Sequence, residues 1–218
     1  MSDMITVKKR HSRIDLTDFH SRKKEEISEL ASRVAAESDT APGLWVLELG
    51  ESASAGTTVL DTLEPLCDLV YAIMKTGSPV ASVVRDAVWG QSLALSLFSM
   101  HSIAHKNTRI KIIRNNGSSS DMAAAYALSI KLGTQRAEAL VNKGACLDAS
   151  NALKAGIISE VAADVFSALD EWIDTAVTAQ GNDHSRLIYQ ASHWRFNAAF
   201  RTGLIELEDL RLSLEDDS

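Results

Sequence analysis

Short apolar runs alternate along the chain with longer segments in which apolar residues recur at helical spacing. Two apolar runs, at residues 44–49 and 80–84, are rich in branched aliphatic side chains and predict buried strands. Between them, apolar residues from Leu63 to Met74 recur every three or four positions, which predicts an amphipathic helix that ends at Gly77. This order of strand, helix and strand predicts a βαβ unit with a right-handed crossover.

The segment at residues 79–103 is the stretch around which we expect the fold to be organised. Its strand is followed by a polar break at Arg85 and Asp86 and by the sequence Trp-Gly-Gln-Ser at residues 89–92. The residues that follow are too apolar for a surface helix, which predicts a buried helix. The first N–H groups of a helix have no partner inside it and lie at the positive end of its dipole. The turn before this helix is therefore suited to hold a developing negative charge.

The remaining pattern also predicts strands and helices. Residues 5–7 predict a first short strand, and residues 16–18 predict the cap of a helix whose apolar stripe runs from Ile27 to Val34. Residues 103–104 and 109–113 predict a strand pair or one bent strand. Further helices are expected from Asp121 to Leu132, from near Thr134, from near Ala149, from near Asp164, and over residues 185–214. The whole pattern predicts an α/β fold with a C-terminal helical segment.

Length, charge and cysteine usage narrow the class of protein. The 218 residues predict one domain, with an α/β core at residues 1–160 and a helical segment of the same domain at residues 161–218. The net charge of −7 argues against a nucleic-acid partner and against an anionic membrane. We find no apolar run long enough for a membrane span and no export signal, so we expect a cytoplasmic protein. Cys67 and Cys146 lack the spacing of metal ligands, and we expect free thiols and no metal site.

The downstream half of the chain carries a more specific pattern. It reads LGTQRAEAL at residues 132–140, LDA at residues 147–149 and ALKAGIISEV at residues 152–161. Together with the strand, the glycine-containing elbow and the buried helix, these segments resemble the crotonase (enoyl-CoA hydratase/isomerase) superfamily over residues 5–161. The resemblance implies a crotonase-like ββα superhelix and an acyl-CoA thioester as ligand. It also implies coenzyme A only as part of the substrate, no tightly bound cofactor, and assembly into a homotrimer or hexamer.

In this family, two loops hold the thioester carbonyl between two backbone N–H groups, so that an enolate oxyanion is stabilised where it forms. Removing one such donor typically costs about two to three orders of magnitude in rate. By position, the resemblance assigns the two donors to the N–H groups of Thr57 and Gln91. The neighbouring positions that it assigns to ligand binding are Ala55, Gly56 and Gly90.

The loop at residues 50–58 has two other interpretations. A glycine-rich phosphate loop is one, but no Lys-Ser or Lys-Thr pair follows the small residues, which disfavours it. An ordinary connection between a strand and a helix is the other, and it stays open.

The chain departs from the family at the positions that carry its chemistry. Gln91 stands where a glycine is usual, so a side chain crowds the expected site. Hydratases of the family use two glutamates, and this chain has Ala94 at the first position and Arg114 near the second. Alanine moves no proton and arginine stays protonated, so water addition by a glutamate pair is not expected. Asp86 is a further candidate, as a base or as a turn residue. Arg114 is another, as a ligand for a carboxylate or a CoA phosphate or as a surface residue.

Three functions stay open. The first is a divergent crotonase that dehydrates or isomerises an acyl-CoA or polyketide thioester in secondary metabolism. The C-terminal pattern is loosely similar to small hydratase-like proteins that assist a type III polyketide synthase in making dihydroxyphenylacetyl-CoA. The second is a catalytically silent subunit that supports a polyketide synthase or a larger crotonase. The third is a Clp-type serine peptidase, which ranks last because Ser92 lies too far along the helix to be its nucleophile.

Overall fold

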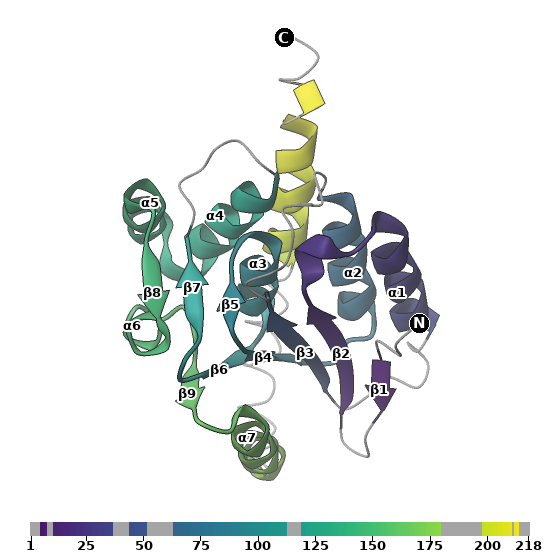
Figure 1. Ribbon diagram of the computed structural model, residues 1–218. Coiled ribbons are helices and arrows are strands. Elements are labelled where there is room, and N and C mark those ends of the chain that lie inside the picture. The colour runs from purple at the N-terminus through teal and green to yellow at the C-terminus, as the bar shows by residue number, and fades with distance from the viewer. Residues whose placement is uncertain are drawn as a thin grey trace.

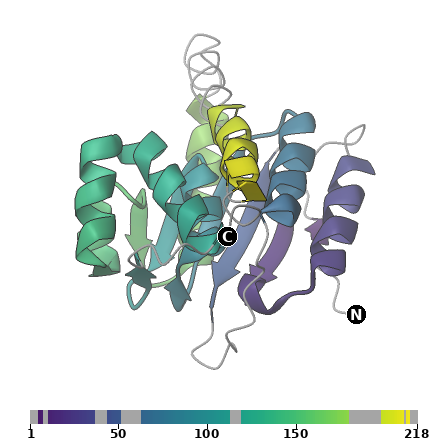
Figure 2. The ribbon, with the colours of Figure 1, turned by 90° about the horizontal axis from the view of Figure 1, so that it is seen from above.

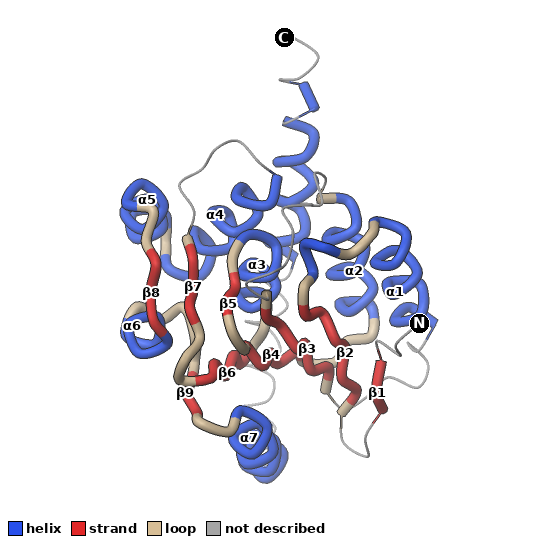
Figure 3. The backbone as a smooth tube through the Cα atoms, in the orientation of Figure 1, coloured by secondary structure: helices blue, strands red, loops and turns tan. Residues whose placement is uncertain are grey.

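Two β-sheets form the frame of the molecule (Figure 1, Figure 3). The computed structural model describes residues 5–7, 11–36, 44–51, 63–112, 119–179, 198–210 and 212–213. The larger sheet has the spatial order β1 (Ile5–Val7), β2 (Ser12–Thr17), β3 (Trp45–Gly50), β4 (Val80–Val84), β6 (His101–His105) and β9 (Glu160–Ala162). The smaller sheet has the order β5 (Ala87–Val88), β7 (Arg109–Lys111) and β8 (Cys146–Asp148). In the larger sheet β1 pairs antiparallel with β2, and every other pair of neighbours is parallel.

Helices connect and cover these strands. They are the 3-10 helix η1 (Phe19–Ser21), α1 (Lys24–Ala36), α2 (Glu64–Lys75), α3 (Gly90–Phe98), α4 (Ser119–Leu132), α5 (Thr134–Lys143), α6 (Ala149–Lys154), α7 (Val165–Ala179) and a helix at residues 198–210. We call this last one the C-terminal helix. Within the residues that the structure describes, we find no helix with the length and apolar character that a membrane span needs.

Different helices cover the two faces of the larger sheet (Figure 1). Successive side chains of a strand point to opposite faces, so neighbours in one strand join different cores. Leu47 of β3 and Val84 of β4 belong to a core that includes residues of α1, α2 and α3. Their neighbours Val46 and Val83 belong to a second core with α7. The central strands are therefore buried on both faces, which explains their continuous apolar sequences.

The C-terminal helix packs between α2 and α4 (Figure 2). Phe200 is fully buried, and its ring centroid lies 5.9 Å from that of Phe98 in α3. At Gly203 the helix approaches Tyr126 so closely that a Cβ atom would lie 1.9 Å from the tyrosine ring. The Tyr126 hydroxyl also donates a hydrogen bond to the carbonyl of Ala199 over 2.9 Å. The helix is thus part of the main core, although it comes last in the chain.

The sequence predictions for the central elements are confirmed. The expected strands at residues 5–7, 44–49 and 80–84 correspond to β1, β3 and β4, and β3 pairs parallel with β4. The expected amphipathic helix corresponds to α2, and the buried helix corresponds to α3. The helices expected near Thr134, Ala149 and Asp164 are α5, α6 and α7.

The prediction of a helix cap at residues 16–18 is wrong. Residues 12–17 form β2, whose side chains alternate between buried and half-buried and which pairs parallel with β3. Asp18 follows in the left-handed conformation with φ 52° and caps the next turn with no side-chain hydrogen bond. Only two of the six residues of β2, Ile14 and Leu16, are apolar, because the polar Ser12 also lies on the buried face, so the segment resembles a loop in the sequence.

A further prediction around β6 is corrected. Residues 103–104 and 109–113 do not form a strand pair or one bent strand, because β6 lies in the larger sheet and β7 lies in the smaller one. The neighbouring His101 begins β6. Its ring stacks on Trp172 of α7, with centroids 4.6 Å apart and planes 1° from parallel.

Candidate active site at the start of helix α3

The turn from β5 into α3 is the elbow that the sequence predicts. Trp89 is extended, with φ −158° and ψ 170°, and Gly90 follows with φ 51°. Glycine adopts this left-handed conformation at little cost, whereas a residue with a side chain is strained there. All nine residues of α3 are buried. The first turn of this helix therefore lies inside the protein.

The backbone N–H of Gln91 donates a hydrogen bond to Ser120 Oγ over 3.1 Å. Both residues are fully buried, and each is the second residue of its helix, Gln91 in α3 and Ser120 in α4. The N-terminal turns of the two helices therefore meet, and both bring the positive end of a helix dipole to the same place. The N–H that the family resemblance assigns as an oxyanion donor therefore donates here to a side-chain oxygen.

A buried carboxylate lies beside the same turn. Glu51, the residue after β3, is 2% exposed, and its Oε1 accepts a hydrogen bond from the hydroxyl of Ser92. Ser92 directly follows Gln91 in α3, and its side chain is fully buried. Burying a carboxylate is costly unless hydrogen bonds and nearby positive charge compensate, and the start of α3 supplies both.

The backbone around Glu51 is fixed by the sheets. Its N–H donates to the carbonyl of Ala87 in β5 over 2.7 Å. The preceding Gly50 packs so tightly against β4's end that a Cβ atom would lie 2.5 Å from the carbonyl oxygen of Arg85. These contacts position the backbone of Glu51 at the end of a central strand of the larger sheet.

Only some of the predicted site residues lie in the part of the chain that the structure describes. Gly90 and Gln91 lie at the elbow and in the first turn of α3, as expected from the resemblance. Ala94 is buried within α3, so the position of the first family glutamate holds a side chain that moves no proton. Ala55, Gly56, Thr57 and Arg114 lie outside the described residues.

Asp86 lies in the turn between β4 and β5, and its residue is exposed. Its backbone has φ 59°, and its carbonyl accepts a hydrogen bond from the N–H of Arg109 over 2.8 Å. These features are those of a turn residue that links the two sheets. The structure brings Glu51, which the sequence analysis did not single out, to the first turn of α3.

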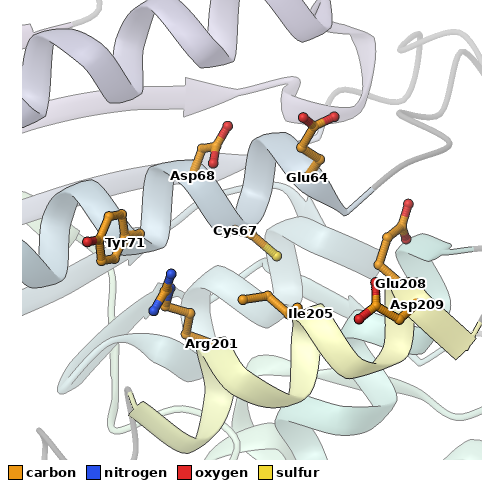
Figure 4. A pocket seen from close by; sticks show the side chains of 8 residues that line it. All are labelled: Glu64, Cys67, Asp68, Tyr71, Arg201, Ile205, Glu208 and Asp209. Atoms are coloured by element: carbon orange, nitrogen blue, oxygen red, sulfur yellow. The ribbon is translucent and has the colours of Figure 1, made fainter.

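A hollow lies between α2 and the C-terminal helix (Figure 4). It has a volume of about 230 Å³ and is lined by Glu64, Cys67, Asp68, Tyr71, Arg201, Ile205, Glu208 and Asp209. The guanidinium of Arg201 lies 4.1 Å from the centre of the Tyr71 ring, which ties the two helices together. Burial, with Asp68 and Glu208 adding to it, raises the pKa of Cys67 to about 12, so its thiol stays protonated at neutral pH.

In the described part of the chain, we find no group of three or more histidine, cysteine or carboxylate side chains that could hold a metal ion.

Comparison with known proteins identifies the fold. No protein-family model matches the chain, and no curated protein matches it. Among solved structures, ThnE from S. clavuligerus matches with 18% identity and a TM-score of 0.63, over 91% of this chain and 94% of that one. Enoyl-CoA hydratase from Bacillus halodurans matches with 14% identity and a TM-score of 0.71, over 95% of this chain and 90% of that one.

A third match is methylmalonyl-CoA decarboxylase in complex with 2-nitronate-propionyl-CoA, with 15% identity and a TM-score of 0.67. It covers 97% of this chain and 89% of that one. At these identities the matches define the fold, and the chain has the crotonase fold of the enoyl-CoA hydratase/isomerase structures. The fold that the sequence motifs predicted is thereby confirmed.

Proposed function

We propose that this chain, which has the crotonase fold, binds an acyl-CoA or polyketide thioester at the start of α3 and moves a proton next to its carbonyl. The observation that supports this is the meeting of a donor and a carboxylate at consecutive residues of one helix turn. Gln91 supplies a buried N–H, and Ser92 holds the carboxylate of Glu51. Formation of an enolate requires both, a group that accepts the proton and donors that stabilise the oxygen.

The proposed chemistry uses Glu51 in place of the family's glutamate pair. Its carboxylate takes the proton from the carbon beside the carbonyl, the electron pair of that C–H bond forms a C=C bond, and the π pair of the carbonyl moves onto the thioester oxygen. Return of that proton from Glu51 to a different carbon isomerises a double bond, whereas its transfer to a departing β-hydroxyl group, which leaves as water, dehydrates the ligand. Because Ala94 is inert, this assignment needs no proton transfer from the position of the first glutamate.

Exchange of protons for deuterium tests this function without knowledge of the natural substrate. A panel of acyl-CoA thioesters is incubated with the protein in D₂O, and loss of the signal from the proton beside the carbonyl is followed by NMR. Glu51→Gln keeps an oxygen to accept the Ser92 hydroxyl but removes the base, so exchange should stop. Asp86→Asn is the matched control, because Asp86 is exposed in a turn, and it should exchange at the wild-type rate. Equal loss in both variants would overturn the role of Glu51.

Binding tests the other half of the proposal. A thioester at a hundred times its dissociation constant should stabilise the protein by about 2.7 kcal/mol, which a thermal shift detects. Gln91→Pro removes this N–H, and with it the hydrogen bond to Ser120, without loss of a hydrogen bond inside the helix, and it should lose this stabilisation. Gln91→Ala keeps the N–H and removes only the side chain, so it should bind at least as well as the wild type.

A second candidate function is a catalytically silent partner subunit of a polyketide synthase or a larger crotonase. The inert Ala94 and the occupation of the Gln91 N–H by Ser120 favour it. This function predicts that the isolated protein exchanges no proton of any thioester, and that co-expression with a type III polyketide synthase raises the yield of that enzyme's product. Proton exchange by the isolated protein would contradict it.

A further inference from the structure

The hydroxyl of Ser120 is an incomplete hydrogen-bonding group. A serine hydroxyl has one hydrogen to donate and two lone pairs that accept. Ser120 is fully buried and accepts the N–H of Gln91, but its own hydrogen has no acceptor among the residues that the structure describes. A buried donor without an acceptor typically costs about 1–3 kcal/mol, so an acceptor that arrives with a ligand would recover this cost.

The surroundings of this hydroxyl favour a negatively charged oxygen. Ser120 and Gln91 lie in the first turns of α4 and α3, so the positive ends of two helix dipoles meet at this point. The N–H that Ser120 accepts also polarises its O–H bond, which makes the hydroxyl a stronger donor. An oxygen atom with partial negative charge is therefore the acceptor that suits this position.

We propose that Ser120 is itself an oxyanion donor, and that its hydroxyl donates to the thioester oxygen while it continues to accept the N–H of Gln91. This inference rests on the proposed function, and it changes the role of Gln91 from a direct donor to one that acts through Ser120. No covalent bond to Ser120 forms or breaks in this scheme. The hydroxyl strengthens one hydrogen bond as negative charge develops on the oxygen.

The experiment measures the carbonyl of a bound thioester directly. Crotonyl-CoA labelled with ¹³C at the carbonyl is bound to the full chain, and its C=O stretch is recorded by isotope-edited infrared spectroscopy. In the wild type, the stretch should lie at lower frequency than in the free ligand. Ser120→Ala should abolish most of that frequency shift and weaken binding about tenfold, as expected for one lost hydrogen bond. Ser120→Thr, which keeps a hydroxyl, should retain the shift.

Ser102→Ala is the matched control. Ser102 is also buried and also accepts a backbone N–H, from Ser159 over 3.2 Å, but it lies in β6. This variant should leave the carbonyl stretch unchanged. Where Ser120→Ala does not fold, Ser120→Cys gives the same comparison, because a thiol is a much weaker donor than a hydroxyl.

The outcomes separate the two proposals. If the wild type binds crotonyl-CoA with a shifted carbonyl and Ser120→Ala keeps the full shift, the role of Ser120 is overturned and the binding site stands. If neither crotonyl-CoA nor another thioester of the panel binds the wild type, the proposed function fails and the role of Ser120 fails with it. A shift lost in Ser120→Ala and kept in both Ser120→Thr and Ser102→Ala supports the inference.

Discussion

The hydroxyl of Ser92 in α3 donates a hydrogen bond to the carboxylate of Glu51 at the end of β3. The two residues are 41 positions apart in the chain, and both side chains are buried. This contact joins the central helix to the end of β3. It also gives the buried carboxylate a donor, which water supplies in the unfolded chain.

The first prediction concerns the energy of this pair. Ser92→Ala leaves the buried carboxylate with one donor fewer, which should lower the free energy of unfolding by about 1–3 kcal/mol in a urea titration. Ser96→Ala on the same helix is the matched control. The hydroxyl of Ser96 is buried with no hydrogen-bond partner among the described residues, so its removal should be neutral or stabilising. Equal destabilisation by both changes would mean that the Ser92 contact contributes little.

The elements around the site could be predicted from the sequence, but the contacts within it could not. Apolar periodicity and β-branched runs predict α2, α3, β3 and β4, because each element buries its own face. The residues that contact the first turn of α3 come from distant parts of the sequence. Gln91 lies 29 positions from Ser120, and Ser92 lies 41 positions from Glu51, so only the tertiary arrangement brings them together. The one local signal for Glu51 is a charged residue two positions after the strand predicted at residues 44–49, and by itself it does not distinguish a buried carboxylate from an ordinary loop residue.

The second prediction concerns the close approach of the C-terminal helix to α4. Gly203→Ala places a methyl group where the Tyr126 ring lies, so the ring must move and lose its hydrogen bond to Ala199. We expect a loss of about 1–3 kcal/mol of stability, which outweighs the gain of about 1 kcal/mol from helix propensity.

In a Tyr126→Ala background the obstacle is absent, so the same Gly203→Ala change should be stabilising by up to about 1 kcal/mol. Urea titrations of the four proteins of this double-mutant cycle measure both effects. The predicted result is a change of sign between the two backgrounds. The same sign in both would show that the methyl group does not meet the ring.

The third prediction concerns pH. Burial lowers the pKa of His101, and the nearby Lys131 adds to this, whereas the contact of its Nε2 with Glu160 Oε2 at 3.3 Å opposes it. The folded state therefore holds fewer protons than the unfolded state, whose histidine titrates at about 6.5. The free energy of unfolding should therefore fall as pH drops below about 6.5. Below the folded-state pKa of His101, this histidine should make no further change to it.

Thermal unfolding of the wild type and of His101→Phe across pH 5–8 isolates this contribution, because phenylalanine keeps a ring against Trp172 but does not titrate. The stability of the wild type relative to the variant should decrease on acidification. An increase would mean that the attraction of Glu160 outweighs burial.

The fourth prediction concerns the two thiols. Cys146 is exposed, whereas burial raises the pKa of Cys67 to about 12. Only the thiolate reacts with a disulfide reagent, and at pH 8 a thiol with this pKa is ionised in about one molecule in ten thousand. Reaction of the folded protein with Ellman's reagent should therefore be biphasic, and Cys146→Ser should remove the fast phase alone. A fast phase that survives in Cys146→Ser would mean that Cys67 is an activated thiol.

The last prediction concerns assembly into the homotrimer or hexamer that the family resemblance implies. The end of the C-terminal helix extends beyond the body of the molecule (Figure 1); Leu210 at this end is 53% exposed, and Leu212, two residues further along the chain, is 47% exposed. Exposed leucines of this kind are suited to contact another subunit.

Light scattering coupled to size-exclusion chromatography should give the mass of a trimer or hexamer for the wild type. The double change Leu210→Glu and Leu212→Glu should give a monomer, because it places charges in the contact. Leu153→Glu, on a leucine of α6 that is 40% exposed, is the control and should keep the wild-type mass. Assembly that survives the double change would place the contact on another surface, and a wild-type monomer would contradict the implied oligomer.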